Sequence, residues 1–121
     1  MTIAILLPLA AAALTAGATW LAEDVAMFER RQINPDLSVV AFGVIEESRC
    51  PAETLCLDPG RLVVAAVASW RGREREVPLE LGTPVRVGDG TLTLVSTATA
   101  ATGQGAIPLQ RYRLTFAYSE D

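Results

Sequence analysis

The chain has 121 residues, half of them hydrophobic and a fifth charged, which predicts one folded domain with a modest core. Its formal net charge of -4 argues against nucleic acid as a partner, because such binding depends on clustered cations. The chain has no histidine, so the commonest general base and the commonest metal ligand are both absent.

The N-terminal segment, residues 1–22, has no charged side chain and predicts a hydrophobic helix that is a signal peptide or a membrane anchor. The small residues Ala16, Gly17 and Ala18 have the form that signal peptidase accepts. Cleavage near Ala18 would give a periplasmic or secreted protein. As an anchor, residues 3–22 would contact the membrane and hold the protein in the inner membrane, facing the periplasm. A buried helix of a soluble protein is a third interpretation.

Residues 23–121 change to short stretches of period two with turn residues between them. This pattern predicts an all-β domain, a small antiparallel β-sandwich of about six to seven strands. Residues 26–33 are either a first strand or a helical extension of the leader. Residues 37–47 and 61–70 are apolar on both faces, which favours central strands, and the second has the pattern of a strand that is covered on both faces.

Residues 73–81 predict an edge strand. Val77, Leu79 and Leu81 alternate with polar residues and are expected to face the core. Pro78 has no backbone N–H to donate to a neighbouring strand, which favours a place at the edge of the sheet.

Three arginines, Arg71, Arg73 and Arg75, lie at the start of this strand and alternate with Glu74 and Glu76. The simplest interpretation is a solvated hairpin whose charges discourage pairing with another sheet edge. Docking of a partner is the alternative interpretation.

The clearest alternation comes last, in residues 110–118, where Tyr112, Leu114, Phe116 and Tyr118 share one face. A small β domain must fill its interior with such large side chains, so we expect this row in the core and not on a ligand surface.

Cys50 and Cys56 are the two cysteines of the chain and enclose five residues. This is not the spacing of a Cys-x-x-Cys redox pair, and a tetrahedral zinc site would need two carboxylates as further ligands. The export signal favours a structural disulfide, which would contribute about 2 kcal/mol by closing so short a loop. Redox chemistry, a metal site and free thiols remain as alternatives.

The segment around these cysteines resembles an uncharacterised group of small bacterial exported proteins, many of them lipoproteins. The matching residues are Ser48, Arg49, Cys50, Pro51, Cys56 and Gly60, and the similarity spans roughly residues 37–118. Glu47 stands where the group has aspartate, Leu57 and Asp58 stand where tryptophan is typical, and no lipobox is present. The resemblance implies an extracytoplasmic β-rich domain and no reaction.

Arg49 has two interpretations. It either contacts an anion while the adjacent bridge holds it rigid, or it pairs with a carboxylate and ties the loop to the end of a strand. The candidate carboxylates are Glu46, Glu47 and Asp58.

We expect no catalytic, cofactor-binding or metal-binding residues. The chain has neither histidine nor lysine to activate a hydroxyl nucleophile, and the adjacent Glu46 and Glu47 point to opposite faces of a strand. The favoured function is a periplasmic binding module for a protein or envelope component. The alternative is an accessory subunit of a membrane complex that keeps residues 3–22 as its helix.

Overall fold

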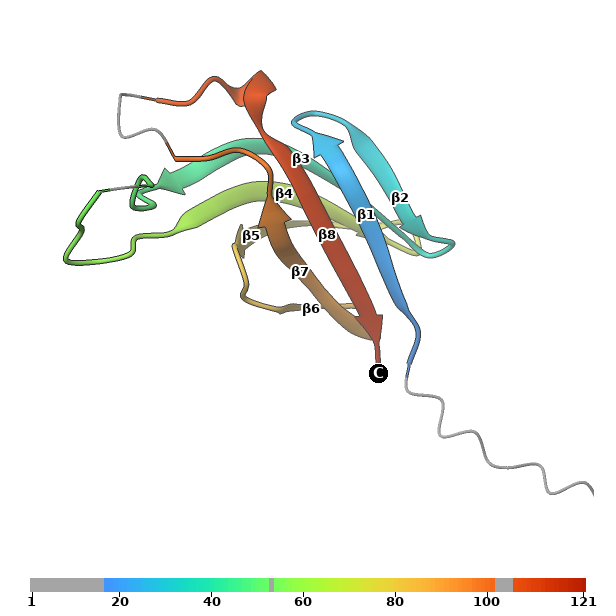
Figure 1. Ribbon diagram of the computed structural model, residues 1–121. Coiled ribbons are helices and arrows are strands. Elements are labelled where there is room, and N and C mark those ends of the chain that lie inside the picture. The colour runs from blue at the N-terminus through green and yellow to red at the C-terminus, as the bar shows by residue number, and fades with distance from the viewer. Residues whose placement is uncertain (1–16, 53, 102–105) are drawn as a thin grey trace, which may run out of the picture.

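The computed structural model describes residues 17–52, 54–101 and 106–121, and in this part the chain forms two antiparallel sheets of four strands each (Figure 1). One sheet has the order β1-β8-β7-β6 and the other the order β2-β3-β4-β5. The strands are β1 (Thr19–Ala26), β2 (Arg30–Asn34), β3 (Leu37–Glu47), β4 (Leu62–Trp70), β5 (Arg73–Glu80), β6 (Val85–Val87), β7 (Gly90–Thr97) and β8 (Arg113–Glu120). The predicted all-β, antiparallel architecture is confirmed.

The two sheets enclose one hydrophobic core, to which the inward rows of both contribute. Along β8 and the residue before it, the inward row is buried as its alternation predicts, from Tyr112 at 1% exposed to Tyr118 at 1% exposed. From the other sheet, the small and branched side chains of β3 and β4 complete the core, among them Leu37, Val39, Ala41, Leu62, Val64 and Ala66.

The first strand begins before residue 23, where the sequence pattern predicts the start of the β domain. β1 begins at Thr19. Thr19 pairs with Ser119 and Ala22 pairs with Phe116 in the register with β8. Residues 19–22, like the segment before them, have no charged side chain, so composition alone gave no sign that a strand begins at Thr19.

The described part of the chain has eight strands, whereas about six to seven were predicted. The difference arises near the start of the domain, where residues 19–34 form two strands. Residues 26–33, predicted as one strand or a helical extension, instead contain the connection between the two sheets. β1 ends at Ala26, Phe28 has a positive φ of 66°, and β2 begins at Arg30. The predicted helix of residues 1–22 lies largely outside the described residues. No helix in the described ranges is long and apolar enough to cross a membrane.

The second sheet places its strands as predicted. β3 and β4 are central, and β5, which contains Pro78, is an edge strand. Full cover on both faces of β4 is not found, because on its outward row Val63 is buried whereas Ala65, Val67 and Ser69 are partly exposed. Two irregularities in the pairing of β3 with β4 fall at Phe42 and Ile45, which are 39% and 61% exposed on the surface. Because Leu37, Val39 and Ala41 are buried, strict alternation would place Phe42 outward and Ile45 inward. A bulge leaves a residue without a partner across the ladder, which explains why Ile45 departs from this alternation.

One substitution pair tests whether β1 belongs to the domain. Ala22→Asp would place an unpaired carboxylate in the core, because Ala22 is 4% exposed, and should lower the free energy of unfolding by about 3 kcal/mol or more. Leu21→Asp, at a neighbouring position that is 58% exposed, should change it by about 1 kcal/mol or less. Urea unfolding of both variants measures the difference, and equal effects would contradict the strand assignment.

Candidate functional site

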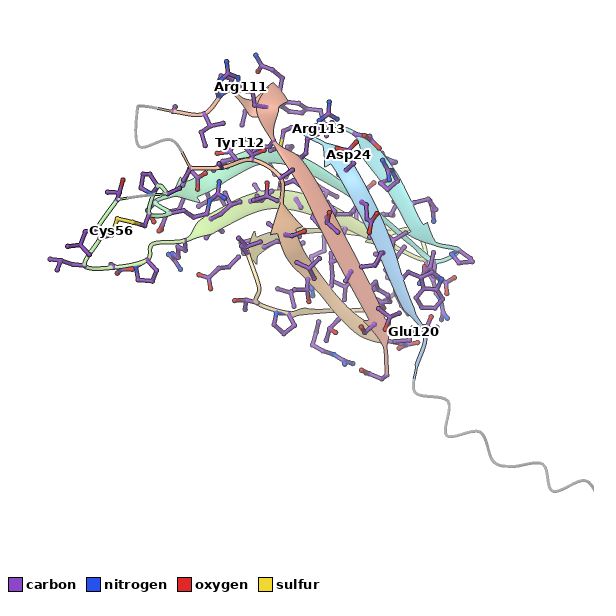
Figure 2. All side chains as sticks on the ribbon, viewed as in Figure 1. Asp24, Cys56, Arg111, Tyr112, Arg113 and Glu120 are labelled. Carbon is purple, nitrogen blue, oxygen red and sulfur yellow. A yellow bond between two sulfur atoms is a disulfide. The ribbon has the colours of Figure 1, made fainter. Side chains whose placement is uncertain are left out.

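The loop between β3 and β4 projects beyond the end of both sheets and carries the two cysteines (Figure 2). Cys50 and Cys56 form a disulfide, with their Cα atoms 6.0 Å apart, so the predicted bridge is confirmed. At the base of the loop the ladder continues for two more backbone hydrogen bonds. Ser48 N–H donates to the Arg61 carbonyl at 2.9 Å, and Cys50 N–H donates to the Pro59 carbonyl at 2.9 Å. Two backbone hydrogen bonds therefore close the base of the loop, and the disulfide closes it a second time nearer the tip.

Gly60 allows the chain to return closely against the outgoing strand. Its φ is +68°, and a Cβ atom at this position would lie 1.7 Å from the Ser48 carbonyl oxygen. Asp58 accepts a hydrogen bond from the Gly60 N–H at 2.7 Å and so supports the turn. The role of Asp58 is thus local, and it is not the carboxylate that pairs with Arg49.

Arg49 pairs with Glu47, one of the three carboxylates that the sequence offered. Its Nε donates to Glu47 at 2.9 Å, and Nη2 donates to the second carboxylate oxygen, which makes a two-point ion pair. Nη1 also donates to the Thr99 carbonyl at 2.9 Å, which joins the cysteine loop to the segment after β7. With both side chains less than a fifth exposed, the guanidinium is engaged on several sides and ties the loop base to both sheets.

Tyr112 completes this cluster from the core side. Its hydroxyl donates to Glu47 Oε1 at 3.3 Å. Burial, followed by the proximity of the Glu47 carboxylate, raises the pKa of Tyr112 to about 12. The pKa of Arg49 is likewise raised, chiefly by its hydrogen bond to Glu47. These groups therefore keep the ionisation states that hold the loop in place throughout the neutral range.

The tip of the loop has a different character from its base. Leu55 is 100% exposed, and Leu57 on the other side of Cys56 is also fully exposed. Leu55 lies inside the disulfide ring and Leu57 directly after it, and neither fully exposed side chain gains stability from the fold of its own chain. The sequence identified the loop but gave no reason to single out these leucines.

A second feature that the sequence did not reveal is an ion-pair network on the outer face of the second sheet. Arg61 pairs with Glu46 and with Glu80, at 3.0 Å in each case, and so links β3, the start of β4 and β5. The pKa of Glu46 is lowered mainly by a hydrogen bond from Ser48 and then by Arg61. All three partners are solvated, so the network orders the surface and adds little stability.

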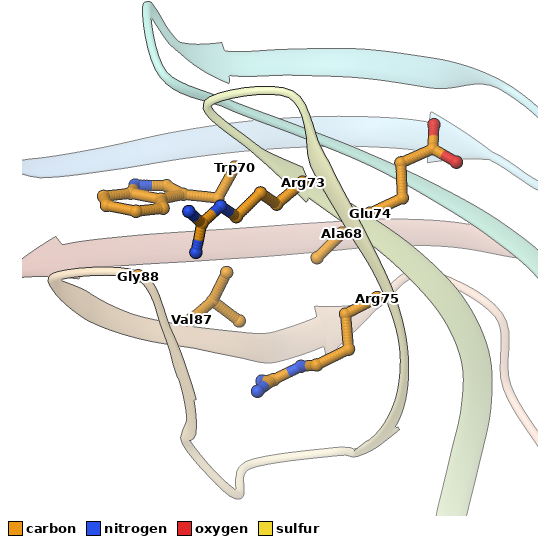
Figure 3. Close-up of a pocket in the computed structure, with 7 residues that line it drawn as sticks. All are labelled: Ala68, Trp70, Arg73, Glu74, Arg75, Val87 and Gly88. Atoms are coloured by element: carbon orange, nitrogen blue, oxygen red, sulfur yellow. The ribbon is translucent and has the colours of Figure 1, made fainter.

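The three arginines of the β4–β5 hairpin occupy two places, one over the Trp70 ring and two along a cavity. Arg71 is in the turn with a φ of 49°, and its guanidinium lies over the Trp70 ring, 4.5 Å from the centroid. Arg73 and Arg75 are exposed on β5 and line a cavity with Trp70 (Figure 3). All three arginines are exposed, and Arg73 and Arg75 share one cavity, so the role of the hairpin stays a prediction.

Among the described residues, no group of three or more histidine, cysteine, aspartate or glutamate side chains is placed to hold a metal ion. Comparisons of the chain with models of protein families, with curated proteins and with solved structures found no match. The resemblance to small exported proteins therefore stays a prediction. The geometry of the chain itself is what bears on function.

Removal of the bridge tests its structural role. The double variant Cys50→Ala and Cys56→Ala should lose about 2 kcal/mol of stability, because the open loop gains freedom in the unfolded state. The melting temperature in oxidising buffer should fall by several degrees. In reductant, the wild-type protein should have the melting temperature of the variant. The melting temperature of the variant should be the same with and without reductant. Equal melting of all samples would contradict a stabilising bridge.

Stability at high pH tests the environment of Tyr112. Its folded pKa of about 12 lies above the ordinary value near 10, so the neutral form is favoured in the folded state. This contribution is full below pH of about 10 and is lost as pH rises through about 12. The difference in unfolding free energy between wild type and Tyr112→Phe should thus be constant up to about pH 10 and then shift against wild type. If the difference in unfolding free energy does not vary with pH, the Tyr112 hydroxyl is in water and not buried beside Glu47.

Proposed function

We propose that the protein is a non-enzymatic, extracytoplasmic binding module that presents residues 48–60 to a protein partner. The observation that carries this proposal is the pair of fully exposed leucines, Leu55 and Leu57, on a loop closed by a disulfide. Burial of one such side chain at an interface is worth about 1.5–3 kcal/mol, and a preformed loop loses little conformational entropy on binding.

The base of the loop supports the same function. Arg49 is tied to Glu47 and to the Thr99 carbonyl, so the tip is mounted on a fixed support. Binding loops on a rigid β framework are a common arrangement, because the framework sets the position of the loop. In this proposal Arg49 positions the loop and does not itself bind an anion.

The bridge and the arrangement of the two ends support an extracytoplasmic location. A disulfide persists in oxidising compartments such as the periplasm, which supports an exported protein. The loop lies at the opposite end of the sheets from Thr19, where β1 begins (Figure 1). Whether the preceding segment is cleaved or kept as an anchor, the loop is directed away from that end.

A second candidate function is an accessory subunit of a membrane complex, and one observation favours it. The outer face of the second sheet exposes Phe42 and Ile45 beside Ala65 and Pro78, with a shallow cavity of about 230 Å³ between them. An exposed apolar patch of this kind is typical of a surface that packs on another protein. A subunit that stays anchored would use this broad face and not only a loop tip.

Crosslinking in intact envelopes tests the loop proposal. A photoreactive side chain at Thr54, beside the two leucines, should give a dominant adduct with one partner. Leu55→Ser with Leu57→Ser should remove this adduct and leave the melting temperature unchanged, because both side chains are exposed. The matched control carries the photoreactive group at Leu21, which is 58% exposed in β1, and should not give the adduct. An adduct that survives the double substitution would refute the role of the loop tip.

The intact mass of protein from the native envelope separates the two candidate functions. A mass that corresponds to Thr19–Asp121 with an oxidised cysteine pair supports the released module and excludes the anchored subunit in its simple form. A mass that retains Met1 favours the accessory subunit.

A further inference from the structure

We propose that the cavity at the β4–β5 hairpin binds a small organic anion, with its carboxylate between Arg73 and Arg75 and its apolar part against Trp70 and Val87. The cavity has a volume of about 360 Å³ and lies between the hairpin of one sheet and the β6–β7 turn of the other (Figure 3). It is at the opposite end of the sheets from the cysteine loop, so this site is independent of the function proposed above.

The two arginines stand in core-facing positions. β4 and β5 pair without a register shift, so Arg73 and Arg75 continue the row of Val77 and Leu79, which are buried in the core. A strand that only solvated its charges would direct arginines to the outer face. Here the outer positions of the same strand carry Glu74 instead, whose side chain points away from both arginines (Figure 3).

Small residues leave the space that these arginines line. Ala68 stands directly across the β4–β5 ladder from Arg75, and its methyl group fills little of the gap. Gly88, in the β6–β7 turn, has a φ of +57°, and a Cβ atom there would lie 2.2–2.5 Å from three atoms of the Trp70 ring. Any larger residue at this turn would displace the indole, so glycine lets the ring form one wall of the cavity.

The Trp70 wall is fixed before any ligand binds. The guanidinium of Arg71 lies over the ring at 4.5 Å from its centroid, which is a cation–π contact. Arg71 is itself held by Asp36, through a backbone hydrogen bond at 2.8 Å and an ion pair at 3.5 Å. A preformed wall reduces the entropy that a ligand must overcome.

The charge of the cavity is not neutralised by the described part of the chain. Arg73 makes no ion pair there, and Arg75 donates to the Arg86 carbonyl and to no carboxylate. Glu74, which also lines the cavity, pairs with Arg30 at 3.7 Å, and Asp121 pairs with Arg86. Two uncompensated guanidinium groups in a chain of net charge -4 mark this cavity as a local anion site.

The surroundings define the class of ligand. A guanidinium group binds a carboxylate in a two-point geometry, and the indole and the Val87 methyl groups offer apolar contact. The matching ligand has a carboxylate on a short aliphatic body. A free organic acid and the C-terminal residue of a peptide share this chemistry.

The test titrates the full chain with N-acetylalanylvaline, with its C-terminal amide and with isovalerate. The chain has two tryptophans, so two indole N–H signals report in nitrogen–proton correlation spectra. Trp20→Phe assigns them. The Trp70 signal should move with a carboxylate ligand, whereas the Trp20 signal should move less. The neutral amide should bind about tenfold more weakly or not at all.

Matched variants test which arginines bind the carboxylate of the ligand. Arg73→Gln and Arg75→Gln should each weaken binding of the carboxylate about tenfold. Arg113→Gln, which removes an exposed arginine at the far end of β8, changes the net charge equally and should leave binding unchanged. Melting curves exclude loss of the fold as the cause.

Binding of the dipeptide alone supports a peptide terminus as ligand, and binding of isovalerate as well supports free acids. Three results would overturn the proposal: no movement of the Trp70 signal with either carboxylate, equal affinity for acid and amide, or equal weakening by Arg113→Gln. In each case Arg73 and Arg75 only cover the open end of the core with their aliphatic stems.

Discussion

The inward row of β8 is the contact on which the rest of the structure depends. Leu114 and Phe116 are fully buried between the two sheets, and Tyr112 and Tyr118 stand at the two ends of the row. Each tyrosine buries its ring and satisfies its hydroxyl within the protein. Tyr112 donates to Glu47 at the base of the cysteine loop, and Tyr118 donates at 2.7 Å to the carbonyl of Val87, next to the hairpin cavity. β8 and the residue before it therefore fill the core. Through Tyr112 they also support the base of the cysteine loop, and through Tyr118 they hold Val87 in the wall of the hairpin cavity.

The two ends of the sheets are built for different partners. At one end a disulfide-closed loop exposes Leu55 within the ring and Leu57 beside it, which suits a protein surface with an apolar pocket. At the other end Arg73 and Arg75 line a cavity that suits a small anion. Because β3 and β4 run the length of the sheet between them, the two regions are far apart and can be changed one at a time. This separation allows each proposal to be tested without disturbing the other.

Several features followed from local pattern. Alternation placed the row from Tyr112 to Tyr118 in the core, and Pro78 placed its strand at a sheet edge, because both signals act over a few residues. Other features depend on contacts between distant segments. The start of β1 at Thr19 depends on its pairing with Ser119, a hundred positions away in the chain, and no local change of composition marks it. The exposure of Ile45 follows from the bulges in β3, which local alternation does not predict.

By itself, the sequence determined the all-β class and the central and edge strands, since period and proline are local properties, and its export signal favoured the disulfide at Cys50 and Cys56. Only the tertiary structure decided which of three carboxylates pairs with Arg49. It also decided that Arg73 and Arg75 share a cavity with Trp70. The physical reason is that an ion pair or a cavity depends on how two sheets face each other, and that arrangement arises from packing across the whole core.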